Sequence, residues 1–144
     1  MELYVLCGLP GSGKTTLAYQ LAEQNDAIVR SIDDIPDSRG NSDIDGKFRR
    51  QWLENIRADL HQGRSVVCDS LALTSMSRKW ILENLSAFDC EKILMVKAVP
   101  VEVCLERNKN RLHKVPEDHI RLTARMLEPP AKDEGWDKIY VYKD

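Results

Sequence analysis

Near the amino end, a glycine-rich segment has the residue types and spacing that bind a chain of phosphates. The segment fits the pattern G-x-x-x-x-G-K-[ST] and continues with a second threonine: Gly8-Leu9-Pro10-Gly11-Ser12-Gly13-Lys14-Thr15-Thr16. Glycines let the backbone curl so that successive N–H groups point at one anion, and the following helix adds its positive dipole end. The lysine of this pattern reaches the β- and γ-phosphates, and the threonine hydroxyl binds Mg²⁺. We therefore expect a nucleoside triphosphate, ATP or GTP, on Lys14 and a magnesium ion on Thr15.

Acidic residues follow two apolar segments farther along the chain. Asp33 and Asp34 come directly after Ser31-Ile32, and Asp69 comes directly after Val66-Val67-Cys68. An acid at such a position can hold Mg²⁺ through water or accept the proton of an attacking hydroxyl. The alternative is structural, because carboxylates also cap helices and loops. We favour the functional interpretation for the Asp33/Asp34 pair and for Asp69.

A basic segment supplies two arginines at helical spacing. Arg107 and Arg111 are four residues apart within residues 106–114, so they share a helix face if the helix continues. Phosphoryl transfer spreads negative charge over the equatorial oxygens, which planar guanidinium groups match with paired hydrogen bonds. We expect a lid over about residues 108–116 that brings these arginines to the phosphates. The alternative is an ordinary solvated helix face.

The elements that must position these side chains alternate along the chain. Five apolar runs predict strands: Leu3–Cys7, Ala27–Ile32, Val66–Cys68, Ile93–Val99 and Ile139–Tyr142. Helices are expected between them, after the glycine-rich turn, over residues 45–62, from 74, from 100 and over 116–127. Helical crossovers make the strands parallel and cover both faces of the sheet. We predict an α/β, three-layer P-loop NTPase fold with a five-stranded parallel sheet, in a single domain over residues 1–144.

The predicted topology gathers the polar residues at one edge. Ligands of open α/β sheets bind beyond the carboxyl ends of the strands. The glycine-rich turn, Asp33 and Asp69 all follow strands directly, so we expect them at the same edge.

The composition restricts the class of protein. Of 144 residues, 42% are hydrophobic and 31% are charged, and the net charge of −2 argues against a generally basic nucleic-acid binder. No apolar run approaches the roughly 18 residues of a membrane span, and a strand rather than a signal peptide opens the sequence. The four cysteines have no C-x-x-C spacing, so we expect reduced thiols rather than a zinc site. These features favour a cytoplasmic protein with no membrane partner and leave its oligomeric state open.

Taken together, the motifs resemble the kinase domain of the polynucleotide 5′-kinases, the P-loop kinases of phage and bacterial end-healing enzymes and of eukaryotic repair. The matching segments cover nearly the whole chain in order: residues 8–16, 31–34, 66–70, 100–111 and 127–139. The phosphate loop alone is shared by many enzymes. The Arg-Asn-x-x-Arg lid together with the final segment is more specific.

The resemblance implies a role for each matching position. Asp33 would be the general base for the acceptor hydroxyl, and Asp69 would support acceptor binding and the lid arginine. Arg111 would clamp the donor phosphates with Arg107 beside it. The stretch from Pro129 to Trp136 would help to form the pocket for the nucleobase.

Two departures from the family pattern lie on the acceptor side. The family usually has an arginine three residues after its catalytic acid, whereas this chain has Pro36, with Arg39 nearby as a possible substitute. The family also commonly follows its third-strand acid with Thr-Asn, whereas Asp69 is followed by Ser70-Leu71. The reaction class is therefore better supported than the acceptor.

We interpret the sequence as an ATP-dependent kinase that transfers the γ-phosphate to a hydroxyl, most simply the 5′-OH end of RNA or DNA. A kinase for a small molecule such as a sugar, nucleoside or antibiotic is the first alternative. A non-catalytic nucleotide-binding module is the second. An acceptor-side acid at Asp33 argues against that module, because binding alone requires no base.

Overall fold

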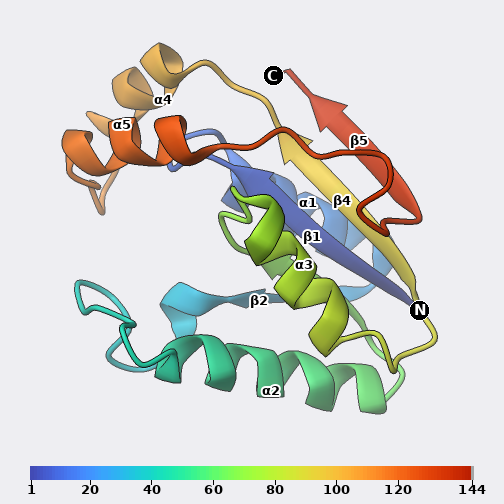
Figure 1. The fold of residues 1–144 in the computed structure, drawn as a ribbon. Coiled ribbons are helices and arrows are strands. Elements are labelled where there is room, and N and C mark those ends of the chain that lie inside the picture. Colours follow the sequence, from blue (N-terminus) through green and yellow to red (C-terminus); the bar gives the residue numbers. More distant parts are fainter. Residues whose placement is uncertain (144) are drawn as a thin grey trace.

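Five parallel strands form the central layer of the computed structural model, which describes residues 1–143 (Figure 1). Their order in the sheet is β2-β3-β1-β4-β5, and every neighbouring pair is parallel. The strands are β1 (Glu2–Gly8), β2 (Ala27–Ser31), β3 (Ser65–Asp69), β4 (Glu91–Lys97) and β5 (Lys138–Tyr142). Because Ser31 pairs with Asp69 and Gly8 with Lys97, the strands that carry the predicted site end near one another.

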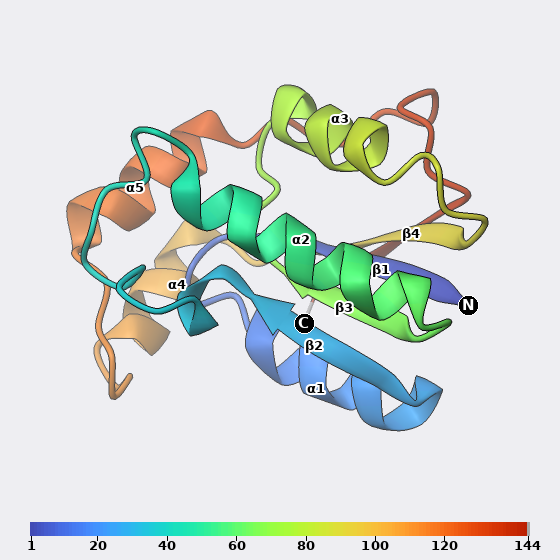
Figure 2. The ribbon, with the colours of Figure 1, turned by 90° about the horizontal axis from the view of Figure 1, so that it is seen from below.

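Helices lie on both faces of this sheet (Figure 2). The helical segments are α1 (Lys14–Asn25), the 3-10 turn η1 (Ile32–Asp34), α2 (Lys47–His61), α3 (Ser75–Asn84), α4 (Val101–Asn108) and α5 (Glu117–Met126). Alternate residues of each strand point to opposite faces. Tyr4 and Leu6 of β1 therefore pack with α1, whereas Leu3 and Val5 pack with α2 and α3.

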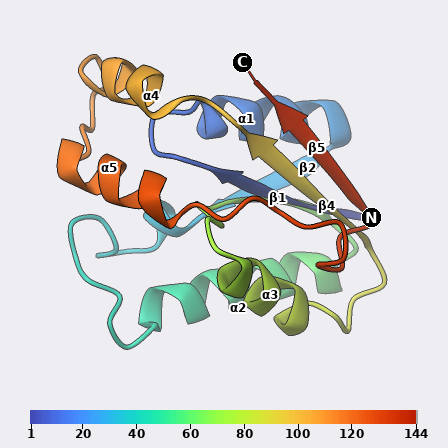
Figure 3. The same ribbon diagram turned by 45° about the horizontal axis from the view of Figure 1, so that its top comes forward.

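A third apolar cluster joins α4 and α5 beyond the carboxyl ends of the strands. Leu9 of the phosphate loop packs there with Cys104 and Leu105 of α4 and with Ile120 of α5. Figure 3 shows α4 and α5 at the end of the sheet toward which β1 and β4 point. The phosphate loop thus has an apolar support on the side away from the strands.

The predicted α/β three-layer architecture is confirmed, with small shifts of the boundaries. Residue 32 begins a 3-10 turn rather than ending a strand, and β4 stops at Lys97 instead of continuing to Val99. Helix α3 starts at a capping box, in which Thr74 and Ser77 each accept the other's backbone N–H. Residue 144, the last of the predicted domain, lies outside the described residues.

The cysteines and the helices bear on two predictions made from the composition. All four cysteines are free thiols there, and Cys7, Cys68 and Cys104 are buried. Across residues 1–143, none of the helices has the length and apolar character that crossing a bilayer requires.

Candidate active site

The phosphate loop has a backbone that only glycine accommodates at two positions. Gly11 and Gly13 have φ angles of 85° and 93°, in the left-handed region. A Cβ at Gly11 would also lie 2.7 Å from the carbonyl oxygen of Cys104 in α4. The N–H of Leu17 donates to the carbonyl of Gly13 at 3.1 Å, so α1 begins as the loop ends. The loop is therefore packed against α4, and its residues Pro10, Gly11 and Gly13 line a cavity.

A cavity of about 630 Å³ lies above this loop and collects most of the predicted residues. From the loop and α1 its lining includes Pro10, Gly11, Gly13, Lys14, Thr15 and Thr16, and from elsewhere Asp33, Asp69, Ser70, Arg107, Arg111 and His119. Gly8 and Ser12 do not line it. Gly8 instead donates its N–H to the carbonyl of Leu71 at 3.1 Å, and Ser12 is completely buried. These two residues therefore belong to the buried part of the loop and not to the cavity lining.

A threonine–aspartate pair forms the edge of the cavity nearest β3. The hydroxyl of Thr15 donates to Oδ2 of Asp69 at 3.1 Å. A hydroxyl and a carboxylate beside a phosphate site are the oxygen ligands that Mg²⁺ takes, with waters and phosphates completing its octahedron. Burial raises the pKa of Asp69, although Lys14 and the hydrogen bond from Thr15 oppose that rise. The donor set fits a magnesium ion held by Thr15 and, directly or through water, by Asp69.

Lys14 lines the cavity together with an acid, Asp69, and an arginine, Arg111. Burial lowers the pKa of its ammonium group, and the neighbouring charge of Arg111 lowers it further. The carboxylate of Asp69 opposes both effects. An anion bound in the cavity would favour the charged ammonium in the same way, so phosphate binding and protonation of Lys14 support each other.

The two acids after β2 lie on different cavities. Asp33 lines the cavity of the phosphate loop, whereas Asp34 lines a second hollow of about 600 Å³ between η1 and the first turns of α2. The turn that carries them is fixed by Ser31, whose hydroxyl accepts the N–H of Asp33 at 3.3 Å. The carboxylate of Asp33 is exposed and faces the same space as Lys14. Asp33 is thus the acid that an acceptor in this cavity would meet.

The two lid arginines line the cavity without sharing a helix. Helix α4 ends at Asn108, and Arg111 lies in the turn that follows, where its N–H donates to the carbonyl of Asn108 at 3.2 Å. Arg107 remains in the helix, and its Nη1 donates to the carbonyl of Ser12 in the phosphate loop at 3.3 Å. Because the helix does not continue to Arg111, the condition for a shared helix face is not met, although both arginines line the cavity.

Sequence reasoning missed the residue that shapes the predicted lid. The buried side chain of Asn108 accepts the N–H of Val115 at 2.9 Å and donates to its carbonyl at 2.7 Å, which closes residues 108–115 into a loop. Sequence reasoning also gave His119 no role in the site. His119 is exposed, yet it lines the cavity from the first turn of α5. A position just after the lid was the only available signal for His119.

The segment before the last strand does not form a nucleobase pocket at Trp136. Trp136 is buried in the core with Ile81 and Leu85, and the N–H of Asp137 donates to the carbonyl of Lys92 at the start of β4. This is the amino end of the sheet, opposite to the phosphate loop. Within the predicted stretch from Pro129 to Trp136, Trp136 therefore cannot contact a nucleobase, because its aromatic ring fills the core beside α3.

Comparison with known proteins supports the fold and assigns the family. A model of the AAA domain family matches residues 3–130. The chain belongs to this family.

Two known proteins have sequences similar to most of this chain. A protein described as a probable thymidylate kinase of Metallosphaera sedula is 26% identical over 158 residues, with 87% of this chain and 81% of that protein covered. Protein kti12 of Schizosaccharomyces pombe is 25% identical over 155 residues, with 95% of this chain covered. The chain spans 55% of the length of that protein.

Solved structures share the fold at low sequence identity. A sugar kinase from Janibacter has a TM-score of 0.76 at 23% identity, with 99% of this chain and 85% of that chain covered. Kti12 of Chaetomium thermophilum, in complex with ADP-AlF3, has a TM-score of 0.71 at 19% identity, with 98% and 88% covered. A fungal RNA kinase has a TM-score of 0.70 at 16% identity, with 99% of this chain but 38% of that chain covered. The fold is that of P-loop kinases, whose acceptors differ from one protein to the next.

Proposed function

We propose that this protein transfers the γ-phosphate of ATP to a hydroxyl acceptor, and that the acceptor is the 5′-OH end of RNA or DNA. The observation that carries the proposal is the composition of one cavity. Lys14 and Thr15 of the phosphate loop, the acid Asp33 and the arginine Arg111 all line it. Nucleotide binding alone needs the first two, whereas transfer to an alcohol also uses a base and a cation that stabilises the transition state.

Each residue has a step in this reaction. The loop N–H groups and Lys14 bind the β- and γ-phosphates, and Thr15 with Asp69 would hold Mg²⁺, which neutralises phosphate charge when bound. Asp33 accepts the proton of the acceptor hydroxyl as that oxygen bonds to the γ-phosphorus. The bond from the γ-phosphorus to the bridging oxygen breaks, and ADP leaves. Arg111 stabilises the charge on the equatorial oxygens during transfer.

A polynucleotide acceptor is supported by the order of the motifs and by a likeness in fold to a fungal RNA kinase. Pro36 stands where the polynucleotide kinases that the motifs resemble usually have an arginine, so the acceptor phosphate needs another partner. Arg39 is exposed in the loop between η1 and α2 and is our candidate. For a single strand that is bound through one to three phosphates, the logarithm of the binding constant should fall with that of salt at a slope of roughly −0.7 to −2. Arg39→Ala should flatten this slope by about 0.7.

A small-molecule acceptor is the second candidate, because the hollow beside Asp34 has a mixed lining. Lys47 and Arg50 are accompanied there by Asp37, Glu54 and the amides of Gln51 and Asn55. Acids within a groove repel a polyanion, whereas alternating donors and acceptors suit a polar, weakly charged molecule.

Transfer of labelled γ-phosphate to a panel of acceptors tests the proposal. The panel contains 5′-OH oligonucleotides of RNA and DNA, nucleosides and sugars, and Lys14→Ala is the control for contaminating kinases. We expect salt-sensitive labelling of the oligonucleotides. Equal labelling of a nucleoside without salt dependence would favour the small-molecule kinase. ATP binding without transfer to any acceptor would contradict the kinase proposal.

A further inference from the structure

The segment after β3 forms one edge of the cavity and includes a residue with a left-handed backbone conformation. Asp69, Ser70 and Leu71 line the cavity, and the carbonyl of Leu71 accepts the N–H of Gly8 at 3.1 Å. The next residue, Ala72, has a φ of 45°, in the left-handed region that a residue with a Cβ adopts only at a cost. Such a conformation persists when the surroundings fix it from several sides.

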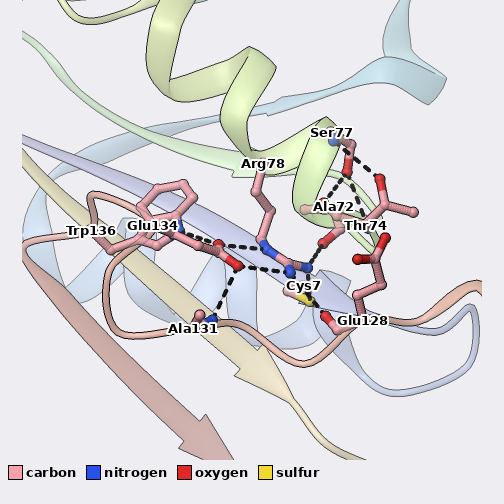
Figure 4. A network of polar contacts seen from close by, with 9 residues as sticks. All are labelled: Cys7, Ala72, Thr74, Ser77, Arg78, Glu128, Ala131, Glu134 and Trp136. Carbon is pink, nitrogen blue, oxygen red and sulfur yellow. Dashed lines mark hydrogen bonds and ion pairs between the residues drawn. The ribbon is translucent and has the colours of Figure 1, made fainter.

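The side chain of Arg78 contacts this residue, Ala72 (Figure 4). Arg78 lies in the first turn of α3 and is completely buried. Its Nη1 donates to the carbonyl of Ala72 at 2.9 Å and lies 4.0 Å from the sulfur of Cys7. Its Nη2 donates to the carbonyl of Glu128 at 2.9 Å. One guanidinium thus touches the end of β1, the loop after β3 and the segment after α5.

The charge of Arg78 is balanced by a carboxylate that is itself held in place. Nε and Nη2 of Arg78 donate to the two oxygens of Glu134 at 2.8 and 3.0 Å. Glu134 also accepts the N–H of Ala131 and the indole N–H of Trp136, both at 3.1 Å. Burial raises the pKa of Glu134, but these hydrogen bonds and the charge of Arg78 outweigh it and lower the pKa below its usual value. Hydrogen bonds therefore hold both side chains of the ion pair in one orientation.

Stability alone is a weak reason for such a pair. Taking both charges out of water is costly, and well-packed apolar side chains often replace buried ion pairs without loss of stability. What apolar side chains cannot replace is the planar fork, which aims donors at a carboxylate and two carbonyls at once. Since the carbonyl of Leu73 also accepts the N–H of Glu128 at 2.8 Å, the loop after β3 is tied to the segment after α5 twice.

We propose that Arg78 is a positioning residue for the magnesium-binding edge of the cavity: its guanidinium holds residues 70–73 in the conformation that aims Asp69 at Thr15. The inference rests on the proposed function in one respect, namely that Thr15 and Asp69 hold the Mg²⁺ of a bound nucleotide. Arg78 itself does not line the cavity.

The test compares three proteins with the natural chain. Arg78→Lys keeps the charge and loses the fork, and the double variant Arg78→Met/Glu134→Met replaces the pair with apolar side chains of similar size. Arg57→Lys is the matched control, because Arg57 also pairs with an acid, Glu54, and donates to a backbone carbonyl, that of Asn84, but away from the cavity. Thermal unfolding first identifies which variants are folded.

The decisive measurement is the Mg²⁺ concentration that gives half-maximal binding of a fluorescent ATP analogue. Loss of a residue that orients a metal ligand costs about 10- to 100-fold in metal affinity. We expect a shift of at least tenfold in Arg78→Lys and in the double variant, with unfolding midpoints close to the natural one for the double variant, and no shift in Arg57→Lys. An unchanged Mg²⁺ requirement in any folded Arg78 variant would overturn the proposal.

This readout is independent of the acceptor. If the natural protein labels no acceptor but its Mg²⁺ requirement shifts in the variants, the kinase proposal fails and the role of Arg78 stands. If the natural protein transfers phosphate, its kcat should fall in the Arg78 variants while the KM for the acceptor changes little.

Discussion

The proposed donor and acceptor sides of the cavity differ in how firmly their residues are held. On the donor side, the phosphate loop is packed against α4, Arg107 donates to the loop carbonyl of Ser12, and Thr15 donates to Asp69. On the acceptor side, Asp33 is exposed on a short 3-10 turn, and a long polar loop separates that turn from α2. A fixed donor side beside an open acceptor side lets one fold serve kinases with different acceptors.

A single substitution on the proposed donor side should reduce phosphoryl transfer the most. Lys14→Ala removes the ammonium group from the phosphates, so transfer should fall by about 10²- to 10³-fold and ATP binding should weaken. Steady-state kinetics and ATP titration measure the two effects. Lys79→Ala is the control, because Lys79 is exposed on α3 and pairs with Glu83. Undiminished turnover in purified Lys14→Ala would remove the phosphate loop from the mechanism.

On the acceptor side we expect a change that affects rate and spares ATP binding. Asp33→Asn is nearly isosteric, and its kcat should fall by about 10²-fold or more because the general base is lost. Asp34→Asn is the matched control and should do less, since Asp34 lines the neighbouring hollow. An inactive Asp34→Asn variant beside an active Asp33→Asn variant would show that Asp34, and not Asp33, is the general base.

Arg111 connects the two sides and should give an intermediate effect. Arg111→Ala should lower kcat by about tenfold or more and raise the KM for ATP less, because a clamp on developing charge acts mainly in the transition state. Arg111→Lys should recover only part of the rate, since an ammonium group cannot form the planar fork. Lys109→Ala, in the same segment but bonded to Glu106, is the control. Full recovery with lysine would make Arg111 a general positive charge.

The smallest effect concerns stability. Burial raises the pKa of Asp69 in the folded protein, so the folded state holds that proton more tightly than the unfolded state does. The free energy of unfolding then falls as pH rises from the ordinary carboxyl pKa through the raised one. Without Mg²⁺ at neutral pH, Asp69→Asn should therefore raise the Tm, because a neutral side chain does not carry the cost of the buried charge. Asp89→Asn, at an exposed site, should leave it unchanged. A lower Tm for Asp69→Asn would mean that its contacts with Lys14 and Thr15 outweigh burial.

The residues that sequence reasoning found share one property, which is that they belong to local patterns. The phosphate loop, the apolar strands and the acids at strand ends are each contained in a few neighbouring residues, and the parallel sheet follows from their alternation. Arg78 and Glu134 are 56 residues apart in the sequence, so no local sequence pattern predicts that they pair. Trp136 was misplaced for the same reason, because its contacts with Ile81 and Leu85 come from another part of the chain.

The end of α4 shows a second kind of limit. The spacing of Arg107 and Arg111 fits a helix face, but the side chain of Asn108 bonds to Val115 and turns the chain before Arg111 is reached. A buried asparagine that bonds to the backbone of a loop competes with helix continuation. Its partner could not be identified from the sequence.

In the proposed mechanism, one cavity holds a donor site and a separate base for an alcohol acceptor. Its most direct test follows both products of labelled ATP, the phosphorylated 5′-OH oligonucleotide and inorganic phosphate, in the natural protein, Lys14→Ala and Asp33→Asn. We predict that Lys14→Ala loses both products, whereas Asp33→Asn loses the labelled oligonucleotide and keeps the slow release of inorganic phosphate. A parallel loss of both products in a folded, ATP-binding Asp33→Asn variant would contradict the separation of the two sides.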